Sequence, residues 1–167
     1  GKDPRNIKQN FQIMTKHGFW KMGVIGMTAI SGIEHALWDI LGKSLNTPVW
    51  QLLGGKVRDK IKIYTHLGLG DMQAVYKDTL ETSKLNDHAM SLVNNGYNSF
   101  KVVFIPFTHY TNSIDILKKV NSLMSSLRET VGDKIDIMVD FHGRCGSGIS
   151  AIQYIKVLEP YNPMFVE

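Results

Sequence analysis

The sequence has little cysteine and no block of like charges, and both shortages exclude classes of protein. Cys145 is the single cysteine among 167 residues, so no intrachain disulfide can form and a reducing compartment is favoured. The net charge of +4 comes from scattered lysines and arginines, which form no basic patch of the kind that binds nucleic-acid phosphates. We therefore expect a cytoplasmic protein that binds no nucleic acid.

Long hydrophobic runs are also missing. No uninterrupted apolar run approaches the roughly 18 residues needed to span a bilayer, and the N-terminus lacks the charged, apolar and small-residue pattern of a signal peptide. We expect no membrane partner. With 43% hydrophobic residues, the chain can nevertheless bury a sizeable core.

The first 58 residues are predicted to be helical. Asp3 and Pro4 form a helix-start signal, because an N-cap carboxylate precedes proline at the first helical position. Apolar residues at helical spacing predict a second helix over residues 28–45, and a brief third helix follows Pro48. This part of the chain is predicted to contain no strand.

From residue 59 onward, strands and helices are predicted to alternate. The predicted strands cover residues 60–66, 99–105, 134–140 and 164–167, and the helices between them cover residues 72–95, 113–131 and 150–158. Such alternation is typical of βαβ units in a parallel sheet. A closed (β/α)8 barrel needs about 250 residues, so we predict an α/β fold with half of a TIM-type barrel. An open, doubly wound sheet is the alternative.

Charged residues at the predicted carboxyl ends of the strands are the candidates for chemistry. Asp140 and His142 lie two residues apart at the end of the third strand and point to the same side if the extended conformation continues. Lys101 lies on the second strand, and Glu167 lies where the fourth strand ends. Because parallel barrels build their active sites at this end, we expect the four side chains to converge.

Two of these residues suit a divalent cation. Mg2+ prefers oxygen ligands, so Asp140 and Glu167 are the predicted metal ligands. His66, at the end of the first strand, could reach the same opening, and Arg144 could pair with a substrate carboxylate, which makes both candidates for substrate binding. Taken one at a time these residues have ordinary structural explanations, such as Asp140 capping the following loop. Their joint placement favours a site.

Several segments resemble one enzyme family. Four motifs carry the resemblance, namely AISGIEHALWDILGK at 29–43, PVWQLLGG at 48–55, DFHGR at 140–144 and EPY at 159–161. The first two resemble the signature of the mandelate racemase and muconate lactonizing enzyme family of the enolase superfamily, and the last two resemble its galactonate dehydratase-like branch. The resemblance implies that residues 1–58 are the incomplete helical part of a capping domain and that residues 59–167 are the incomplete first half of a barrel.

The same resemblance implies roles for the site residues. It makes Asp140 and Glu167 magnesium ligands, and it makes His142 the acid that protonates a departing hydroxyl. Lys101 matches the first lysine of the family's Lys-x-Lys motif and is the implied partner of a substrate carboxylate. The sequence therefore predicts a small-molecule carboxylate as substrate and Mg2+ as cofactor, and we expect a homo-oligomer.

Val103 departs from the family pattern. It stands where the motif has its second lysine, and a valine cannot act as a base. The base would then be a histidine on a later strand. We predict a hydro-lyase, a Mg2+-dependent sugar-acid dehydratase that removes the proton next to a carboxylate and eliminates water to give a 2-keto-3-deoxy acid. The alternatives are a hydroxy-acid racemase or epimerase of the same family and an inactive, truncated polypeptide.

Overall fold

The described residues divide into two compact units. The computed structural model describes residues 1–21, 23–68, 81–107 and 110–167. The first unit is Gly1–Ile61 and the second is Lys62–Glu167. The boundary predicted between residues 58 and 59, and the assignment of the two parts to a cap and a barrel, stay predictions.

The first unit contains only helices in its described part, namely α1 (Ile7–His17), α2 (Gly23–Ser44) and α3 (Val49–Leu52). α1 begins later than the helix-start signal indicates. The Asp3 carboxylate does not cap a helix, because it pairs with the Arg5 guanidinium at 2.8 Å. The first helical residue is therefore Ile7 and not Pro4.

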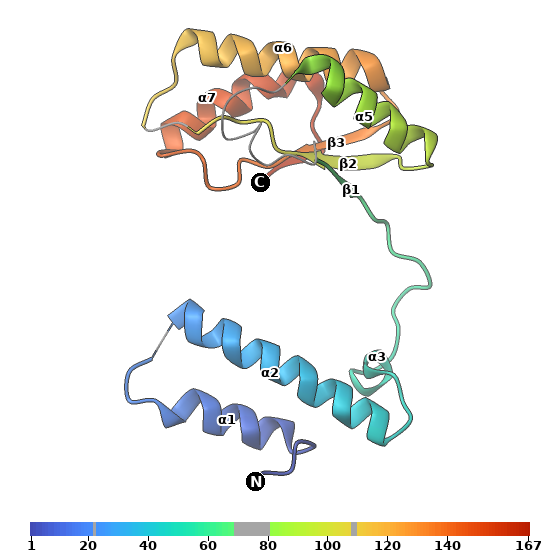
Figure 1. Ribbon diagram of the computed structural model, residues 1–167, viewed down its shortest axis with the longest axis vertical. Coiled ribbons are helices and arrows are strands. Elements are labelled where there is room, and N and C mark those ends of the chain that lie inside the picture. The colour runs from blue at the N-terminus through green and yellow to red at the C-terminus, as the bar shows by residue number, and fades with distance from the viewer. Residues whose placement is uncertain (22, 69–80, 108–109) are drawn as a thin grey trace. The chain divides into compact units, whose positions relative to one another are not determined.

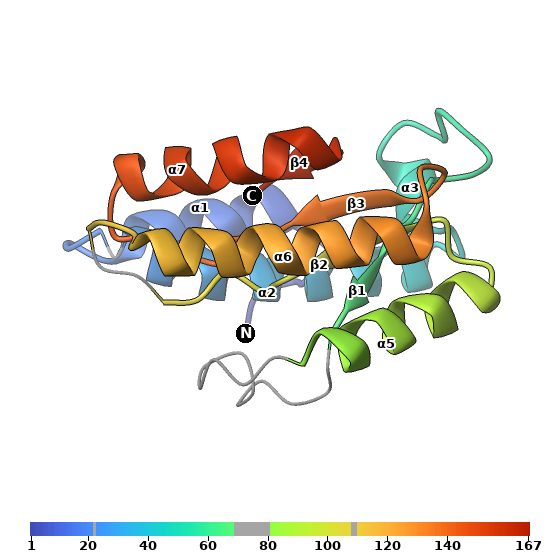
Figure 2. The same ribbon diagram turned by 90° about the horizontal axis from the view of Figure 1, so that it is seen from above.

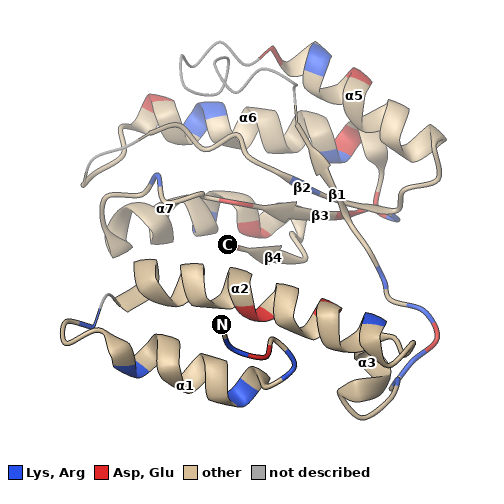
Figure 3. Cartoon of the chain, turned by 60° about the horizontal axis from the view of Figure 1, so that its bottom comes forward, with Lys and Arg blue, Asp and Glu red and all other residues tan. Residues whose placement is uncertain are grey.

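α2 is longer and more uniformly apolar than predicted. It begins at Gly23 and not at residue 28, and Glu34, Asp39 and Lys43 are its only residues of the types Asp, Glu, Lys and Arg. Most of the helix is accordingly tan in Figure 3. By length and composition alone, this helix could cross a membrane, although core helices of soluble proteins share these properties. No uninterrupted apolar run marks this helix in the sequence, because small and polar residues separate its apolar ones.

The second unit is a parallel sheet with helices on one face (Figure 1). Its strands are β1 (Thr65–Leu67), β2 (Ser99–Val102), β3 (Asp136–Val139) and β4 (Phe165–Val166). Its described helices are α5 (Thr82–Asn94), α6 (Ile114–Val131), α7 (Gly148–Leu158) and the short 3-10 helix η1 (Glu159–Tyr161).

The order of the strands decides between the two predicted folds. The strands are neighbours in chain order, β1-β2-β3-β4, and every pair is parallel. Helices α5, α6 and α7 lie on the same face, with α6 between the other two (Figure 2). A doubly wound sheet reverses its strand order at a switch point and carries helices on both faces. The described part is instead a segment of a (β/α)8-type barrel, as predicted.

The strands are shorter than the sequence indicates. β1 begins at Thr65 because the preceding Ile61 and Ile63 are exposed and make no ladder with β2. β2 ends at Val102 and β3 covers only Asp136–Val139. The first part of the helix predicted over residues 72–95 lies outside the described residues, and its described part is α5.

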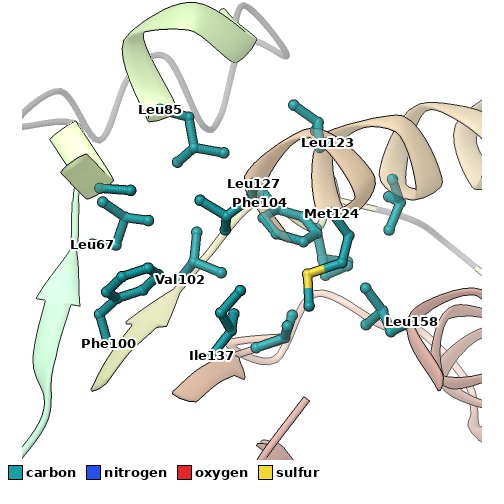
Figure 4. Close-up of a cluster of buried hydrophobic side chains, with 14 of the residues drawn as sticks. Leu67, Leu85, Phe100, Val102, Phe104, Leu123, Met124, Leu127, Ile137 and Leu158 are labelled. Atoms are coloured by element: carbon teal, nitrogen blue, oxygen red, sulfur yellow. The ribbon is translucent and has the colours of Figure 1, made fainter. Parts of the chain in front are cut away.

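An apolar core fills the space between the sheet and the helices (Figure 4). Alternate strand residues face it, because successive side chains of a strand point to opposite sides. The members shown are Leu67, Phe100, Val102, Phe104 and Ile137 from the strands and the segment after β2, and Leu85, Leu123, Met124, Leu127 and Leu158 from the helices. Burying a side chain of this size contributes about 1.5–3 kcal/mol. This core therefore fixes the helices to one face and leaves the other face of the sheet for polar groups.

Arg128 links α6 to the chain segments that lead into β3 and β4. Its Nη1 donates hydrogen bonds to the carbonyl oxygens of Ile135 at 2.7 Å and Gly132 at 3.0 Å, and its Nε donates to that of Tyr161 at 3.2 Å. Burial lowers the pKa of the guanidinium from its ordinary value, but arginine stays protonated in proteins. One side chain thus supplies charged donors to three carbonyl oxygens in two segments.

Replacing Arg128 tests this link. We expect Arg128→Met to lower the free energy of unfolding by about 2 kcal/mol, because partly buried carbonyl groups lose a charged donor. Lys118 is an exposed basic residue of the same helix and gives the matched control, Lys118→Met, which should change the stability by about 0.5 kcal/mol or less. Urea unfolding followed by circular dichroism measures both variants. Equal midpoints for the two would contradict the proposed link.

Candidate functional site

Three charged side chains meet at the carboxyl ends of β2, β3 and β4. The ammonium Nζ of Lys101 lies 3.2 Å from Oδ2 of Asp140 and 2.8 Å from Oε2 of Glu167. The Asp140 side chain is 7% exposed and that of Lys101 is 16% exposed, whereas that of Glu167 is 58% exposed. The structure therefore brings together three of the residues that the sequence singles out.

The strand register explains this meeting. Lys101 pairs with Met138 of β3, so Asp140, two residues further on, points to the same face of the sheet. Backbone bonds continue the ladder beyond the strands, because the Asp140 amide donates to Val102 and the Glu167 amide donates to Val139, both at 2.9 Å. Lys101 is level with Met138 of β3 and, through it, with Phe165 of β4. The two carboxylates lie two residues further along these strands, within reach of the long Lys101 side chain.

His142 reaches the same cluster by a different route. The extended conformation on which the shared direction of Asp140 and His142 depends does not continue to His142, because β3 ends at Val139 and the backbone of His142 has a φ of 50°. The chain instead turns back on Asp140. The His142 amide donates to Asp140 Oδ1 at 2.6 Å, and its Nδ1 lies 3.3 Å from Oδ2. The turn, and not strand alternation, brings the two side chains together.

The cluster shifts the pKa values of two of its members. The pKa of Lys101 is raised, chiefly by the hydrogen bond to Glu167 and further by Asp140, against the opposing effect of burial. Burial would raise the pKa of Asp140, but hydrogen bonds from Lys101 and from the amide and ring of His142 together outweigh it and leave the pKa lowered. At neutral pH the site thus combines an ammonium with an ionised, nearly buried carboxylate.

The donor set suits a hard cation. The carboxylates of Asp140 and Glu167 already converge on one positive group, the Lys101 ammonium. Mg2+ is commonly held by one or two carboxylates, with water or substrate oxygens completing its coordination. Within the described part of the chain, no group of three or more histidine, cysteine or acidic residues could hold a metal ion. These two carboxylates therefore fit Mg2+ as two ligands of a larger set.

The two predicted substrate-binding residues have different surroundings. His66 is exposed and pairs with Lys101 in the strand register, so it lies on the same face of the sheet. Arg144 is only 1% exposed, and its Nη1 donates to the carbonyl oxygen of Ile105 at 2.6 Å. Its guanidinium carbon lies 5.2 Å from the centre of the Phe107 ring. In this structure Arg144 faces the protein interior and is not presented to a substrate.

Tyr64 is a neighbour of the site that the sequence reasoning missed. The Lys101 ammonium lies 5.9 Å from the centre of the Tyr64 ring, which packs edge to face on Phe165 at 6.1 Å. A signal was present, because Tyr64 lies two residues before His66 in the strand predicted over residues 60–66. Strand alternation places a residue at that spacing on the same face as His66.

Comparison with known families follows the division of the chain. Residues 1–54 match the family described as "Mandelate racemase / muconate lactonizing enzyme, N-terminal domain". Residues 84–167 match the family described as "Enolase C-terminal domain-like". The second match alone includes half of the chain and contains Lys101, Asp140, His142 and Glu167.

Solved structures agree with both matches. A protein provisionally named a dehydratase, from Zymomonas mobilis ZM4, is 29% identical with a TM-score of 0.88, over 99% of this chain and 45% of that one. A member of the enolase superfamily from Salmonella Typhimurium is 31% identical with a TM-score of 0.86, over 99% and 46%.

A third structure, a mandelate racemase/muconate lactonizing enzyme from Sulfitobacter sp, is 29% identical with a TM-score of 0.82, over 98% of this chain and 42% of that one. The chain thus spans less than half the length of each of these three structures. The two family matches and the shared fold show that the chain belongs to the mandelate racemase and muconate lactonizing enzyme family of the enolase superfamily.

Proposed function

We propose that this chain carries the acid and two metal ligands of a Mg2+-dependent sugar-acid dehydratase of the galactonate dehydratase-like branch. The observation that carries the proposal is the placement of His142 against Asp140, beside the Lys101 ammonium. A histidine held beside a carboxylate can donate a proton to a departing hydroxyl as a general acid. The dehydratase name of the Zymomonas mobilis relative supports the same class of reaction.

The metal and the lysine would act on the substrate carboxylate. Asp140 and Glu167 would hold Mg2+, which would supply positive charge to offset the negative charge that develops when the proton next to the carboxylate leaves. Lys101 would donate a hydrogen bond to a carboxylate oxygen of the substrate. Its raised pKa keeps it charged for that task.

His142 would move the proton that makes water the leaving group. Its Nδ1 faces Asp140, so Nε2 is the atom left to face a substrate, and the ring is on a side chain that is 58% exposed. The protonated ring would donate to the departing hydroxyl as the C–O bond breaks. The product is an enol that becomes a 2-keto-3-deoxy acid. Asp140 would stabilise the protonated ring until transfer.

The base that starts the reaction is proposed to be a histidine on a later strand of the whole enzyme. Val103, in the position of the second lysine of the family motif, has no group that can accept the proton. A racemase or cycloisomerase that uses a lysine at this position is therefore disfavoured. We further propose a small sugar acid as the substrate, a homo-oligomeric enzyme and a cytoplasmic location, with no nucleic-acid or membrane partner.

The first test replaces the proposed acid in the whole enzyme. His142→Asn should lower formation of the 2-keto-3-deoxy acid by about 100-fold or more, because the hydroxyl loses its proton donor. Exchange of the substrate α-proton with deuterium from D2O should continue, since that step needs only the base and the metal. A keto-acid assay and NMR measure the two rates. His17, an exposed histidine of α1, gives the control His17→Asn. Unchanged dehydration in the His142 variant would refute the acid role.

A second test concerns the metal. Asp140→Asn should weaken Mg2+ binding by about tenfold or more, because a charged ligand becomes neutral. Asp136 lies at the other end of β3 and pairs with Lys62, so Asp136→Asn is the matched control and should bind Mg2+ as the unmodified protein does. Titration calorimetry with Mg2+ compares the variants. Equal affinities for both would rule out Asp140 as a ligand.

A further inference from the structure

The segment that follows β3 is a tight turn held in an unusual backbone conformation. The Arg144 amide donates to the Phe141 carbonyl at 2.9 Å, and the two residues between them, His142 and Gly143, have φ values of 50° and 67°. A positive φ at both central positions is the pattern of a type I′ turn. Glycine adopts it freely, whereas a residue such as histidine is disfavoured there by about 1 kcal/mol.

The His142 ring does not supply the contacts that hold this turn. Its side chain is 58% exposed, and its ring contacts Asp140 Oδ2, while the His142 backbone amide donates to Asp140 Oδ1. Those bonds orient the amide and the ring but lie on the strand side of the turn. The far side of the turn therefore needs a separate attachment.

Arg144 supplies that attachment. It is among the largest of the fully buried side chains in the described part, at 1% exposure, and its Nη1 donates to the Ile105 carbonyl at 2.6 Å. The guanidinium also lies over the Phe107 ring. A hydrogen bond from a charged donor is roughly twice as strong as a neutral one, and burial strengthens it further. The turn after β3 is thereby tied to the segment that follows β2. Lys101 lies in β2 itself.

We propose that Arg144 is a positioning residue that fixes His142 relative to Asp140 and Lys101. This inference rests on the proposed function for the identity of His142 as the acid. Without the anchor, the disfavoured φ of His142 relaxes, and its ring moves away from Asp140. Arg144 then affects elimination without touching the substrate. This differs from the direct contact with a substrate carboxylate that the sequence suggests.

The kinetic test uses the whole enzyme with its sugar-acid substrate. Arg144→Met should lower kcat for elimination by about 100-fold, the loss typical of a misplaced catalytic group, with KM nearly unchanged. Exchange of the substrate α-proton with D2O should change by less than about threefold, because it does not use His142. Arg144→Lys, which keeps one charged donor, should recover part of the loss. The exposed Arg58 gives the control Arg58→Met, which should leave both rates unchanged.

A double variant shows whether Arg144 acts through His142. Arg144→Met combined with His142→Asn should be no slower in elimination than His142→Asn alone, because the misplaced group is already absent. Additive losses would overturn the proposal. It would also be overturned by a rise in KM with kcat unchanged, which indicates substrate binding, or by equal losses of elimination and α-proton exchange.

Hydrogen exchange separates this inference from the proposed function. In Arg144→Met, backbone amides of residues 141–145 should exchange about tenfold faster, while those of the sheet keep their protection. That result supports the anchor even if the enzyme dehydrates no sugar acid, an outcome that would refute the proposed function alone. Exchange that is unchanged, or faster throughout the protein, would overturn the positioning role. If the methionine variant fails to fold, Arg144→Lys should give a smaller increase confined to residues 141–145, and no increase there would overturn the positioning role.

Discussion

The attraction between the Lys101 ammonium and two carboxylates is the interaction on which the site depends. Asp140 and Glu167 come from neighbouring strand ends, where two negative groups would otherwise repel each other. Opposite charges 4 Å apart attract by about 4 kcal/mol at the effective dielectric constant of about 20 found near protein surfaces, and solvent screening reduces this attraction for the half-exposed Glu167. The ammonium makes both contacts at once, and the shifted pKa values of Lys101 and Asp140 record the result. The two carboxylates are thereby held close to one point, which a positive charge occupies.

This attraction operates only because the backbone brings the strand ends to one level. The parallel ladder continues past the last strand residues through the amides of Asp140, Phe141 and Glu167. The core between the sheet and α5, α6 and α7 turns Phe100 and Ile137 away from the site and leaves Lys101 on the other face. The ordinary packing of a barrel segment therefore determines which residues can meet.

The features that repeat along the chain were predictable from the sequence. The alternation of strands and helices gave the parallel sheet, and the parity of Lys101 and Asp140 gave a shared face, because both depend on local periodicity. The conformation of His142 was not predictable in this way, since a left-handed residue before Gly143 depends on contacts made elsewhere. The burial of Arg144 was missed for a similar reason, because Ile105 is distant in sequence. The catalytic and metal-binding roles of these residues stay predictions.

Backbone hydrogen bonds position the two carboxylates of the site, whereas a turn with a side-chain attachment positions His142. Asp140 and Glu167 are placed by backbone ladder bonds, which do not depend on the identity of nearby side chains. His142 is placed by a turn whose attachment to the rest of the protein includes a side chain, Arg144. A substitution in the turn can therefore alter proton transfer while the two carboxylates keep their places. In a family whose solved members carry both dehydratase and racemase names, such a turn is a place where chemistry can change without moving the two carboxylates.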